Sequence, residues 1–375
     1  MIAKVLFWGS LGALAWTHVG YPAAMGVLAR VRPRPVRRGD IEPSVALVVS
    51  AHDEEAVIGR RVENLLELDY PPERLEIVVA SDGSTDRTNE IVEEAAAREP
   101  RVRLLRCPRE GKVAAQHRAF RETDSEVLAF TDANTEWKPD ALSKLVRNLA
   151  DPEVGYVCGQ LRLESSDGAN LEGLYWRYEV WVREQESRAS SITAGNGAIY
   201  AVRREAYVED DPKFGHDFGL PYVMEQHGRR AVYDPEAVAV EKPASELEDE
   251  YGRKVRMNAR SWGHIVTGRM FGRTRPLYLA ELVSHRVLRY SSGLLHVVLL
   301  VANVALLGQG LFYRVFLALQ LGGLGLAAAG KARLPVPGAR LAYYYFLVTR
   351  ATAAGLVRYL RSGTPQTWEK AKGTR

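Results

Sequence analysis

Short β-branched runs alternate with helical patterns through the middle of the chain. Runs typical of strands lie at residues 45–50, 75–81, 102–107 and 126–132, and helical patterns lie at residues 54–68, 86–99 and 112–123. Strands that alternate with helices predict an α/β fold with a mostly parallel sheet and helices on both faces. Because ligands of such sheets bind at the carboxyl ends of the strands, we expect a functional site at that edge.

The start of the chain has a different pattern. Residues 1–29 form an apolar run long enough to span a bilayer, and the basic linker at residues 30–43 follows it. The positive-inside rule then puts the N-terminus outside and the middle of the chain in the cytoplasm. A signal peptide is the alternative, but the run is too long and has no convincing cleavage site. We therefore predict a retained transmembrane anchor.

The C-terminal part is apolar again. Residues 289–331 contain two apolar runs around a short Gln309-Gly310 turn, which predicts a transmembrane hairpin. Residues 332–375 include a further apolar stretch with Arg350 at its middle. Because an arginine in the middle of a bilayer is costly, we prefer an interfacial helix with a cytoplasmic tail, and a further span stays open. Together these segments predict a multi-pass protein of the cell membrane.

Charge and cysteine content narrow the picture. The formal net charge of +4 is too small to indicate a nucleic-acid partner. Cys107 and Cys158 are the only cysteines, and each ends an apolar run that resembles a strand. Two cysteines are too few for a disulfide framework or a thiolate metal site, so we expect buried reduced thiols.

Three of the expected strands end in acidic segments, at residues 51–55, 81–86 and 131–134. Any one of these segments could simply cap the next helix or favour its dipole, but three on the same edge indicate a site. Neither GxGxxG nor GxxxxGK[ST] follows a strand. Phosphates would therefore be reached through Mg²⁺ or Mn²⁺, whose preferred oxygen ligands Asp132 and Asn134 supply.

Several motifs resemble those of the family 2 glycosyltransferases, which are inverting enzymes with the Rossmann-like GT-A fold. "SAHDEE" is similar to the opening motif of the family, "VVASDGSTD" to its second motif and "TDAN" to its DxD-type motif. The resemblance covers residues 44–262, and the flanking segments resemble those of the hyaluronan, cellulose, chitin and poly-N-acetylglucosamine synthases. It implies a cytoplasmic GT-A domain at residues 44–245, with transmembrane helices on both sides.

The resemblance also implies a nucleotide-sugar site. Ala51, Asp53 and Glu54 would line the uracil and ribose pocket, and Asp82 would contact the base or the ribose. Lys112 would lie near the phosphates or the sugar, although a solvated lysine at a helix start is the alternative.

The DxD-type motif is altered in this chain. Asp132 would contact the ribose or sugar, and Asn134 would take the metal-ligand position where the family usually has a second acid. That replacement lowers the negative charge of the ligands, so the resemblance implies weaker metal binding.

"TAGNGAIYAVRREAY" resembles the acceptor segment of the family, so Gly195, Asn196 and Gly197 would let the acceptor approach the backbone. The next similar segment opens with the catalytic acid, which makes Asp217 the candidate general base. The family often has an acid just before this residue, whereas this chain has His216. An N-cap role for Asp217 is the alternative.

Residues 246–288 are predicted to be an interfacial amphipathic segment. They contain "RKVRMNARSW", an altered form of the QxxRW motif of processive family members, with Met257 for the glutamine and Trp262 displaced by one position. Arg256 and Arg260 would bind the diphosphate and Trp262 the acceptor. A basic helix lying on the membrane would show the same residues.

The resemblance implies transfer of a sugar from a UDP-sugar to a lipid-linked sugar or a growing polysaccharide, and possible partner subunits. Two other classes stay open. A sugar nucleotidyltransferase uses a similar sheet but would carry a Gly-rich signature, which is missing here. An inactive membrane-anchored scaffold would explain Asn134 and the altered QxxRW.

Overall fold

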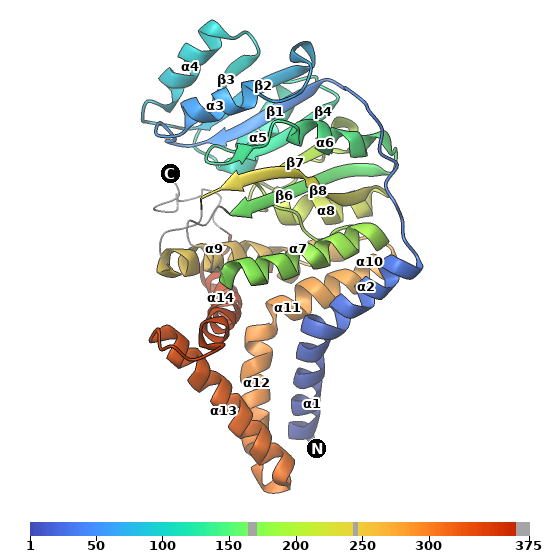
Figure 1. Ribbon diagram of the computed structural model, residues 1–375, viewed down its shortest axis with the longest axis vertical. Coiled ribbons are helices and arrows are strands. Elements are labelled where there is room, and N and C mark those ends of the chain that lie inside the picture. Colours follow the sequence, from blue (N-terminus) through green and yellow to red (C-terminus); the bar gives the residue numbers. More distant parts are fainter. Residues whose placement is uncertain (164–170, 243–246, 365–375) are drawn as a thin grey trace.

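The computed structural model describes residues 1–163, 171–242 and 247–364. Its centre is an eight-stranded sheet in the order β3-β2-β1-β4-β7-β6-β8-β5 (Figure 1). The strands are β1 (Val45–Ala51), β2 (Leu75–Asp82), β3 (Val102–Cys107), β4 (Val127–Asp132), β5 (Glu136–Trp137), β6 (Val154–Leu163), β7 (Tyr200–Arg203) and β8 (Arg230–Glu241).

The sheet is mixed but mostly parallel, as predicted, because four of its seven strand pairs are parallel. Strands β3, β2, β1 and β4 run parallel to one another, and β6 runs parallel to β8. The pairs β4–β7, β6–β7 and β5–β8 are antiparallel. The turn before β7 lies next to Lys112 and Asp132, at the carboxyl end of β4. Strand β7 therefore starts at that edge and runs back along β4.

Helices cover both faces of the sheet, as predicted. Val45, Leu47 and Val49 of β1 point into one core with α3 (Ile58–Leu66), α4 (Thr88–Arg98) and α6 (Ala141–Val146). Ala46 and Val48 point into the other core with α5 (Lys112–Arg121) and α8 (His216–Gln226). The alternation follows from the two-residue period of a strand, and apolar residues in succession fit a strand buried on both faces. Cys107 and Cys158 lie in the second core as free buried thiols, as predicted.

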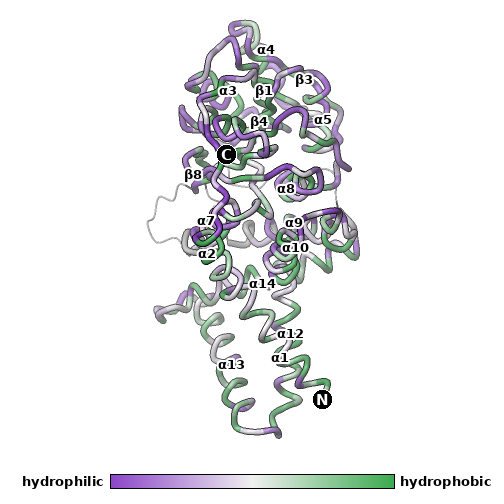
Figure 2. The backbone as a smooth tube through the Cα atoms, turned by 90° about the vertical axis from the view of Figure 1, so that its right-hand side faces the viewer, coloured by the Kyte–Doolittle hydropathy of each residue, from purple (hydrophilic) through white to green (hydrophobic). Residues whose placement is uncertain are grey.

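A second, helical part lies against the sheet domain. It contains α1 (Ile2–Ala15), a π-helical turn (Trp16–Gly20), α2 (Tyr21–Val31), α7 (Leu171–Ala189), α9 (Leu247–Val266), α10 (Pro276–Glu281), a second π-helical turn (Leu282–Val287), α11 (Leu288–Tyr290), α12 (Ser292–Ala305), α13 (Leu311–Lys331) and α14 (Ala339–Ser362). Helices α1, α12 and α13 project away from the sheet in Figure 1, and Figure 2 shows how apolar they are. Phe7 and Leu14 of α1 pack with Leu299 of α12 and Tyr313 of α13.

Helices α12 and α13 form the hairpin expected at residues 289–331. Among the described residues, α13 is the one helix that is by itself long and apolar enough to cross a membrane. The chain from α10 through α12 would give a second span, with a bend of 65°. Large apolar side chains lie exposed on α1, α12 and α13, including Val5, Val301 and Leu319. The anchor at residues 1–29 and the multi-pass location stay predictions.

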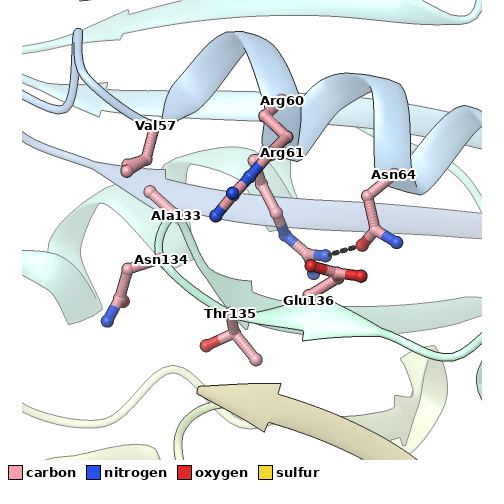
Figure 3. Close-up of a pocket in the computed structure, with 8 residues that line it drawn as sticks. All are labelled: Val57, Arg60, Arg61, Asn64, Ala133, Asn134, Thr135 and Glu136. Carbon is pink, nitrogen blue, oxygen red and sulfur yellow. Dashed lines mark hydrogen bonds between the residues drawn. The ribbon is translucent and has the colours of Figure 1, made fainter. Parts of the chain in front are cut away.

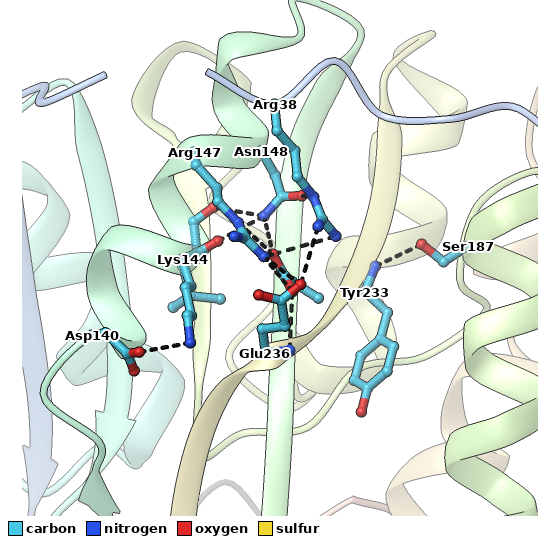
Figure 4. Close-up of polar contacts among 10 residues, drawn as sticks. Arg38, Asp140, Lys144, Arg147, Asn148, Ser187, Tyr233 and Glu236 are labelled. Carbon is cyan, nitrogen blue, oxygen red and sulfur yellow. Dashed lines mark hydrogen bonds and ion pairs between the residues drawn. The ribbon is translucent and has the colours of Figure 1, made fainter. Parts of the chain in front are cut away.

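The basic linker lies along the sheet domain. Arg34 forms an ion pair with Glu153 at 3.0 Å, and Arg38 forms one with Asp234 at 3.5 Å. Asp234 is buried and also pairs with Arg147 at 2.9 Å. Arg38 and Arg147 both form ion pairs with Glu236 as well (Figure 4). These contacts hold the linker against the sheet, because burying the Asp234 carboxylate is costly unless it is paired with a cation.

Helices α9 and α14 pack against each other beneath the sheet domain. Gly355 of α14 lies close to Asn258 of α9. A Cβ at position 355 would lie only 2.6 Å from the Asn258 side chain, so the glycine allows the two helices to approach closely. Arg350 lies over the Tyr251 ring at 5.2 Å. An interfacial helix and a further span both stay predictions for this segment.

Candidate active site

The acidic ends of β1 and β2 hold each other in place. The Asp53 carboxylate accepts hydrogen bonds from the Thr85 N–H at 2.7 Å and the Asp86 N–H at 3.4 Å. The Ser84 hydroxyl accepts one from the Asp53 N–H at 3.0 Å. Asp53 has φ of 51°, an uncommon conformation for a residue other than glycine. These bonds give Asp53 a structural role and shape the loops that would receive a nucleotide.

Neighbouring residues of these two loops are also engaged. The Asp86 carboxylate accepts a hydrogen bond from the Thr88 N–H at 3.0 Å at the start of α4, whose N-cap is Arg87. Glu54 is buried, and its N–H donates to the Thr88 hydroxyl at 2.7 Å. Ala51 is completely buried at the end of β1. Ala51 and Glu54 are therefore both buried at the sheet edge where the nucleotide pocket is predicted.

Asp82 organises the loop that leads into α5. Its buried carboxylate accepts hydrogen bonds from the N–H groups of Glu110 at 2.8 Å and Gly111 at 2.9 Å. Arg109 pairs with the same carboxylate at 2.6 Å. Gly111 has φ of 101°, which suits glycine, and the next residue is Lys112. Asp82 thereby fixes the position from which Lys112 extends.

Lys112 brings three distant segments together. Its ammonium group forms an ion pair with Asp132 at the end of β4 and donates a hydrogen bond to the Gly197 carbonyl at 3.3 Å. A Cβ at Gly197 would lie 3.2 Å from Nζ of Lys112 and 4.0 Å from a carboxylate oxygen of Asp132. The predicted donor residues Lys112 and Asp132 thus meet the predicted acceptor turn.

A small polar pocket lies beside this contact, between α3 and the loop after β4 (Figure 3). Arg61 reaches into it from α3 and donates to the Thr131 hydroxyl at 2.7 Å. Burial lowers the pKa of the Arg61 guanidinium to about 9, while Asp132 and Glu136 oppose that change. Arg61 therefore carries its charge at neutral pH, close to the altered DxD-type motif.

Asn134 contacts an acid that the sequence reasoning did not include. Its amide nitrogen donates to the Glu241 carboxylate at the end of β8, at 2.9 Å. With the amide nitrogen on Glu241, the amide oxygen of Asn134 is the atom able to bind a cation. Glu241 is an acid at the end of a strand, as Asp132 is, so the same sequence feature could have identified it.

The oxygens of Asp132, Asn134 and Glu241 suit Mg²⁺ or Mn²⁺. Within residues 1–163, 171–242 and 247–364, no group of three or more His, Cys, Asp and Glu could hold a metal ion. A cation at this edge would need the phosphates of a bound nucleotide among its ligands, as Mg²⁺ commonly does.

The predicted acceptor turn is held by buried side chains. Arg183 of α7 donates to the carbonyl oxygens of Ala194 at 3.1 Å and Gly195 at 3.3 Å. Asn196 is buried, and its amide nitrogen donates to the Gly159 carbonyl at 2.8 Å while its oxygen accepts from the N–H of Ile199 at 3.0 Å. The side chain of Asn196 thus shapes the turn.

Asp217 lies next to this turn. Its carbonyl oxygen accepts a hydrogen bond from the Gly195 N–H at 2.7 Å. The N-cap of α8 is Gly215, and Asp217 lies in the first turn without capping the helix. The N-cap alternative for Asp217 is therefore wrong, and its half-buried carboxylate remains available for chemistry.

His216 lies in a buried polar cluster below Asp217. Its ring nitrogens lie 3.0 Å from the Tyr200 hydroxyl, 3.3 Å from the Tyr207 hydroxyl and 3.4 Å from a ring nitrogen of His117. Burial, then His117 and Lys112, hold the pKa of His216 well below its usual range. A neutral imidazole therefore replaces the acid that the family often has at this position.

Arg260 of α9 lies within electrostatic range of Asp217. Burial lowers the pKa of Arg260; Asp217 opposes that shift, whereas Arg256 and Arg358 add to it. These three guanidinium groups and the Asp217 carboxylate are therefore electrostatic neighbours. Arg358 of α14 was not among the predicted residues, because it lies about a hundred positions from α9 in the sequence.

Trp262 does not lie at this site. It is 5% exposed, and its indole nitrogen donates to the Thr352 carbonyl at 2.9 Å, between α9 and α14. Its predicted acceptor-binding role does not fit this burial. Met257, which stands for the glutamine of the motif, is exposed. Of the altered QxxRW, Arg260 lies within electrostatic range of Asp217, and Arg256 within range of Arg260.

Comparison with known proteins supports a glycosyltransferase domain. Residues 46–210 match the family described as Glycosyl transferase family 2. The chain is similar to the β-monoglucosyldiacylglycerol synthase of Nostoc sp., with 30% identity over 213 residues, 53% of this chain and 44% of that protein. It is also similar to an N-acetylglucosaminyltransferase of Sinorhizobium fredii, with 30% identity over 225 residues, 55% of this chain and 54% of the relative. The chain spans about half the length of these relatives.

One solved structure is similar to this protein over nearly the whole chain. The mannosyltransferase PcManGT from Pyrobaculum calidifontis, in complex with GDP-Man and Mn²⁺, has a TM-score of 0.74 at 24% sequence identity. The likeness covers 96% of this chain and 98% of that one, including the helical part. The sheet domain accordingly has the GT-A fold, and residues 46–210 are a glycosyltransferase domain of family 2.

Proposed function

We propose that this protein is an inverting glycosyltransferase that moves a sugar from a nucleoside diphosphate sugar to a membrane-associated acceptor. The observation that carries this proposal is the meeting of Lys112, Asp132 and Gly197, in the turn that also contacts Asp217. It puts predicted donor residues beside predicted acceptor and base residues. The names of the relatives, a glucosyldiacylglycerol synthase and an N-acetylglucosaminyltransferase, support sugar transfer.

The donor would lie along the ends of β1, β2 and β4. Ala51, Asp53, Glu54 and Asp82 form or fix the loops for the nucleoside, which we propose to be uridine because of the family resemblance. Arg256, Arg260 and Lys112 would offset the charge of the diphosphate, since guanidinium and ammonium groups bind phosphate oxygens well.

The transfer would occur in one step. An acceptor hydroxyl oxygen attacks the anomeric carbon, and the bond from that carbon to the diphosphate oxygen breaks with its electrons leaving on the diphosphate. Asp217 takes the hydroxyl proton as the general base. Because attack and departure lie on opposite faces of the sugar, the configuration inverts. Lys112 and Arg260 stabilise the negative charge that grows on the leaving group.

A divalent cation, Mg²⁺ or Mn²⁺, would be held by Asn134 and Asp132, with Glu241 as an additional carboxylate. Such an ion supplies positive charge at the diphosphate when it is bound. The Mn²⁺ in the PcManGT complex supports a metal-dependent reaction. Asn134 and Glu241 together would restore the negative charge that the altered DxD-type motif lacks.

The helical part favours an acceptor at the membrane. Exposed apolar side chains on α1, α12 and α13 would face lipid, and the sheet domain would lie in the cytoplasm. Addition of one or a few sugars to a lipid carrier fits the buried position of Trp262 better than long-chain synthesis, because no stacking tryptophan reaches the acceptor turn from α9. Polymer synthesis with partner subunits would need another side chain to contact the acceptor in place of Trp262.

The proposal can be tested with purified protein in lipid nanodiscs. UDP-sugars and GDP-sugars would be supplied with Mg²⁺ or Mn²⁺ and with alkyl acceptors that end in a hydroxyl, a sugar or a phosphorylated sugar. We expect nucleoside diphosphate release that depends on one donor and one acceptor class. Absence of both nucleotide binding and release would favour the inactive scaffold, and pyrophosphate formation from a nucleoside triphosphate and a sugar phosphate would indicate a nucleotidyltransferase.

A further inference from the structure

A polar pocket lies where the apolar helices meet the sheet domain. Its walls include His18 from the first π-helical turn, Glu179 from α7, Asn258 from α9, and Tyr345 from α14. Arg286 and Tyr290 close it from the second π-helical turn and α11. The pocket measures about 530 Å³, including the solvent at its mouth. A pocket with charged walls at the edge of an apolar bundle calls for a ligand with a polar head.

Most charges around the pocket are already paired. Glu179 forms an ion pair with Arg289, and Glu186 accepts a hydrogen bond from His285 at 2.6 Å. Glu186 is also bonded by the Tyr21 hydroxyl at 2.6 Å. Arg286 lies within electrostatic range of both carboxylates and helps to lower the pKa of each, but it forms no ion pair with either.

Arg286 is the exception. It is 7% exposed, and its Nε donates to the Thr193 hydroxyl at 2.8 Å. Over the part of the chain that the structure describes, neither terminal nitrogen of Arg286 has a hydrogen-bond acceptor or an ion-pair partner. A guanidinium with unused donors on a pocket wall suits an anion, whose oxygens accept hydrogen bonds from such N–H groups.

The pocket is connected to the candidate active site through three contacts. Thr193, which receives the bond from Arg286, begins the turn that holds Gly195 and Gly197. The Arg286 guanidinium also lies 5.9 Å from the ring of Phe218, the residue after Asp217. Tyr290, on the pocket wall, lies 6.1 Å from the same ring. A ligand in the pocket would therefore lie on the acceptor side of the predicted base.

We propose that this pocket binds the phosphate group of a lipid-linked acceptor, with Arg286 as its main anion ligand. The inference rests on the proposed function and names the class of acceptor. An arginine presents parallel N–H donors that fit phosphate oxygens, and Asn258 and Thr349 add neutral polar groups to the same walls. The lipid chain would lie among the apolar helices, and a hydroxyl carried beyond the phosphate would reach Asp217.

The test measures binding of dodecyl phosphate, dodecanol and inorganic phosphate to the full-length protein in maltoside micelles, by calorimetry. We expect the wild type to bind dodecyl phosphate more tightly than the other two probes. Arg286→Gln should weaken that binding about ten- to a hundredfold, because a charge-assisted contact is lost, and Arg286→Lys should retain most of it. Arg340→Gln, at an exposed arginine next to the same bundle, is the matched control and should bind as the wild type does.

Nucleoside diphosphate binding is measured on every variant as a check of the fold and of the donor site. Equal binding of dodecyl phosphate by the wild type and Arg286→Gln, with nucleotide binding retained, would overturn the inference. Equal affinity for inorganic phosphate or dodecanol would also overturn it, because the site would then recognise a free anion or a neutral chain. If the wild type binds dodecyl phosphate through Arg286 but binds no nucleotide, the proposed function fails and the anion site stands.

Discussion

Gly195 offers a quantitative test of how the acceptor turn is packed. A Cβ at this position would lie 2.1 Å from the Tyr156 hydroxyl oxygen and 3.2 Å from the Cys158 sulfur. Ordinary contact begins at 3.4 Å, so the hydroxyl would have to move by about 1.3 Å, the difference between 3.4 and 2.1 Å. Tyr156 is completely buried and its ring stacks on Tyr200 at 5.5 Å, which leaves it little room. Gly195→Ala should therefore lower the free energy of unfolding by about 1–3 kcal/mol.

Gly197→Ala is the matched control in the same turn. Its Cβ would meet the end of the flexible Lys112 side chain at 3.2 Å, and Lys112 can shift by a few tenths of an ångström. Stability should change by less than about 0.5 kcal/mol, as is usual away from the core. Donor affinity should change little, because the ammonium group of Lys112 stays beside Asp132 after so small a shift.

The assay is urea unfolding of the purified variants, followed by tryptophan fluorescence, with transfer activity measured on the same samples. Tyr156→Phe combined with Gly195→Ala should recover part of the lost stability, since it removes the nearest atom in the clash. Equal unfolding midpoints for Gly195→Ala and the wild type would refute the close packing of this turn against Tyr156.

Three other predictions concern the charges around the site. Glu241→Gln should weaken Mn²⁺ binding in the presence of nucleoside diphosphate about tenfold, while Asn134→Asp should strengthen it; Mn²⁺ titration followed by electron paramagnetic resonance would show both, and unchanged affinities would remove Glu241 from the site. Lys112→Met should weaken nucleotide binding about tenfold or more in calorimetry, and wild-type affinity would exclude its phosphate role. Burial raises the pKa of Glu186, but His285 and Arg286 outweigh it and hold that pKa at about 2. The stabilisation from ionised Glu186 is fully present above its unfolded pKa of about 4.5 and is lost as the pH falls toward 2; a Glu186→Gln variant should lack this acid-dependent loss in unfolding experiments.

The sequence was sufficient to predict the strand ends of the site. Asp53, Asp82 and Asp132 end apolar runs whose alternation with helices identifies a sheet, and parallel strands bring such ends to one edge. The roles of Asp53 and Asp82 in holding loops were not visible, because they depend on backbone N–H groups about thirty residues away. Loop geometry of this kind needs three-dimensional coordinates.

The residues that sequence reasoning missed are linked to the site by long-range packing. Arg183 and Arg286 contact the acceptor turn from helices on either side of it, and neither belongs to a recognisable motif. Trp262 shows the opposite error. It lies in a motif-like segment, but one extra residue on a helix rotates a side chain by about 100°, and the indole packs against α14 instead of the site.

The general base provides the most direct test of the central claim. Single-turnover transfer would be measured for the wild type, Asp217→Asn and the control Asp124→Asn, whose side chain is fully exposed on the surface. We expect Asp217→Asn to lower the transfer rate about 10²- to 10⁴-fold, with nucleotide affinity and stability retained. Asp124→Asn should transfer at the wild-type rate. Transfer by Asp217→Asn at the wild-type rate would show that Asp217 is not the general base.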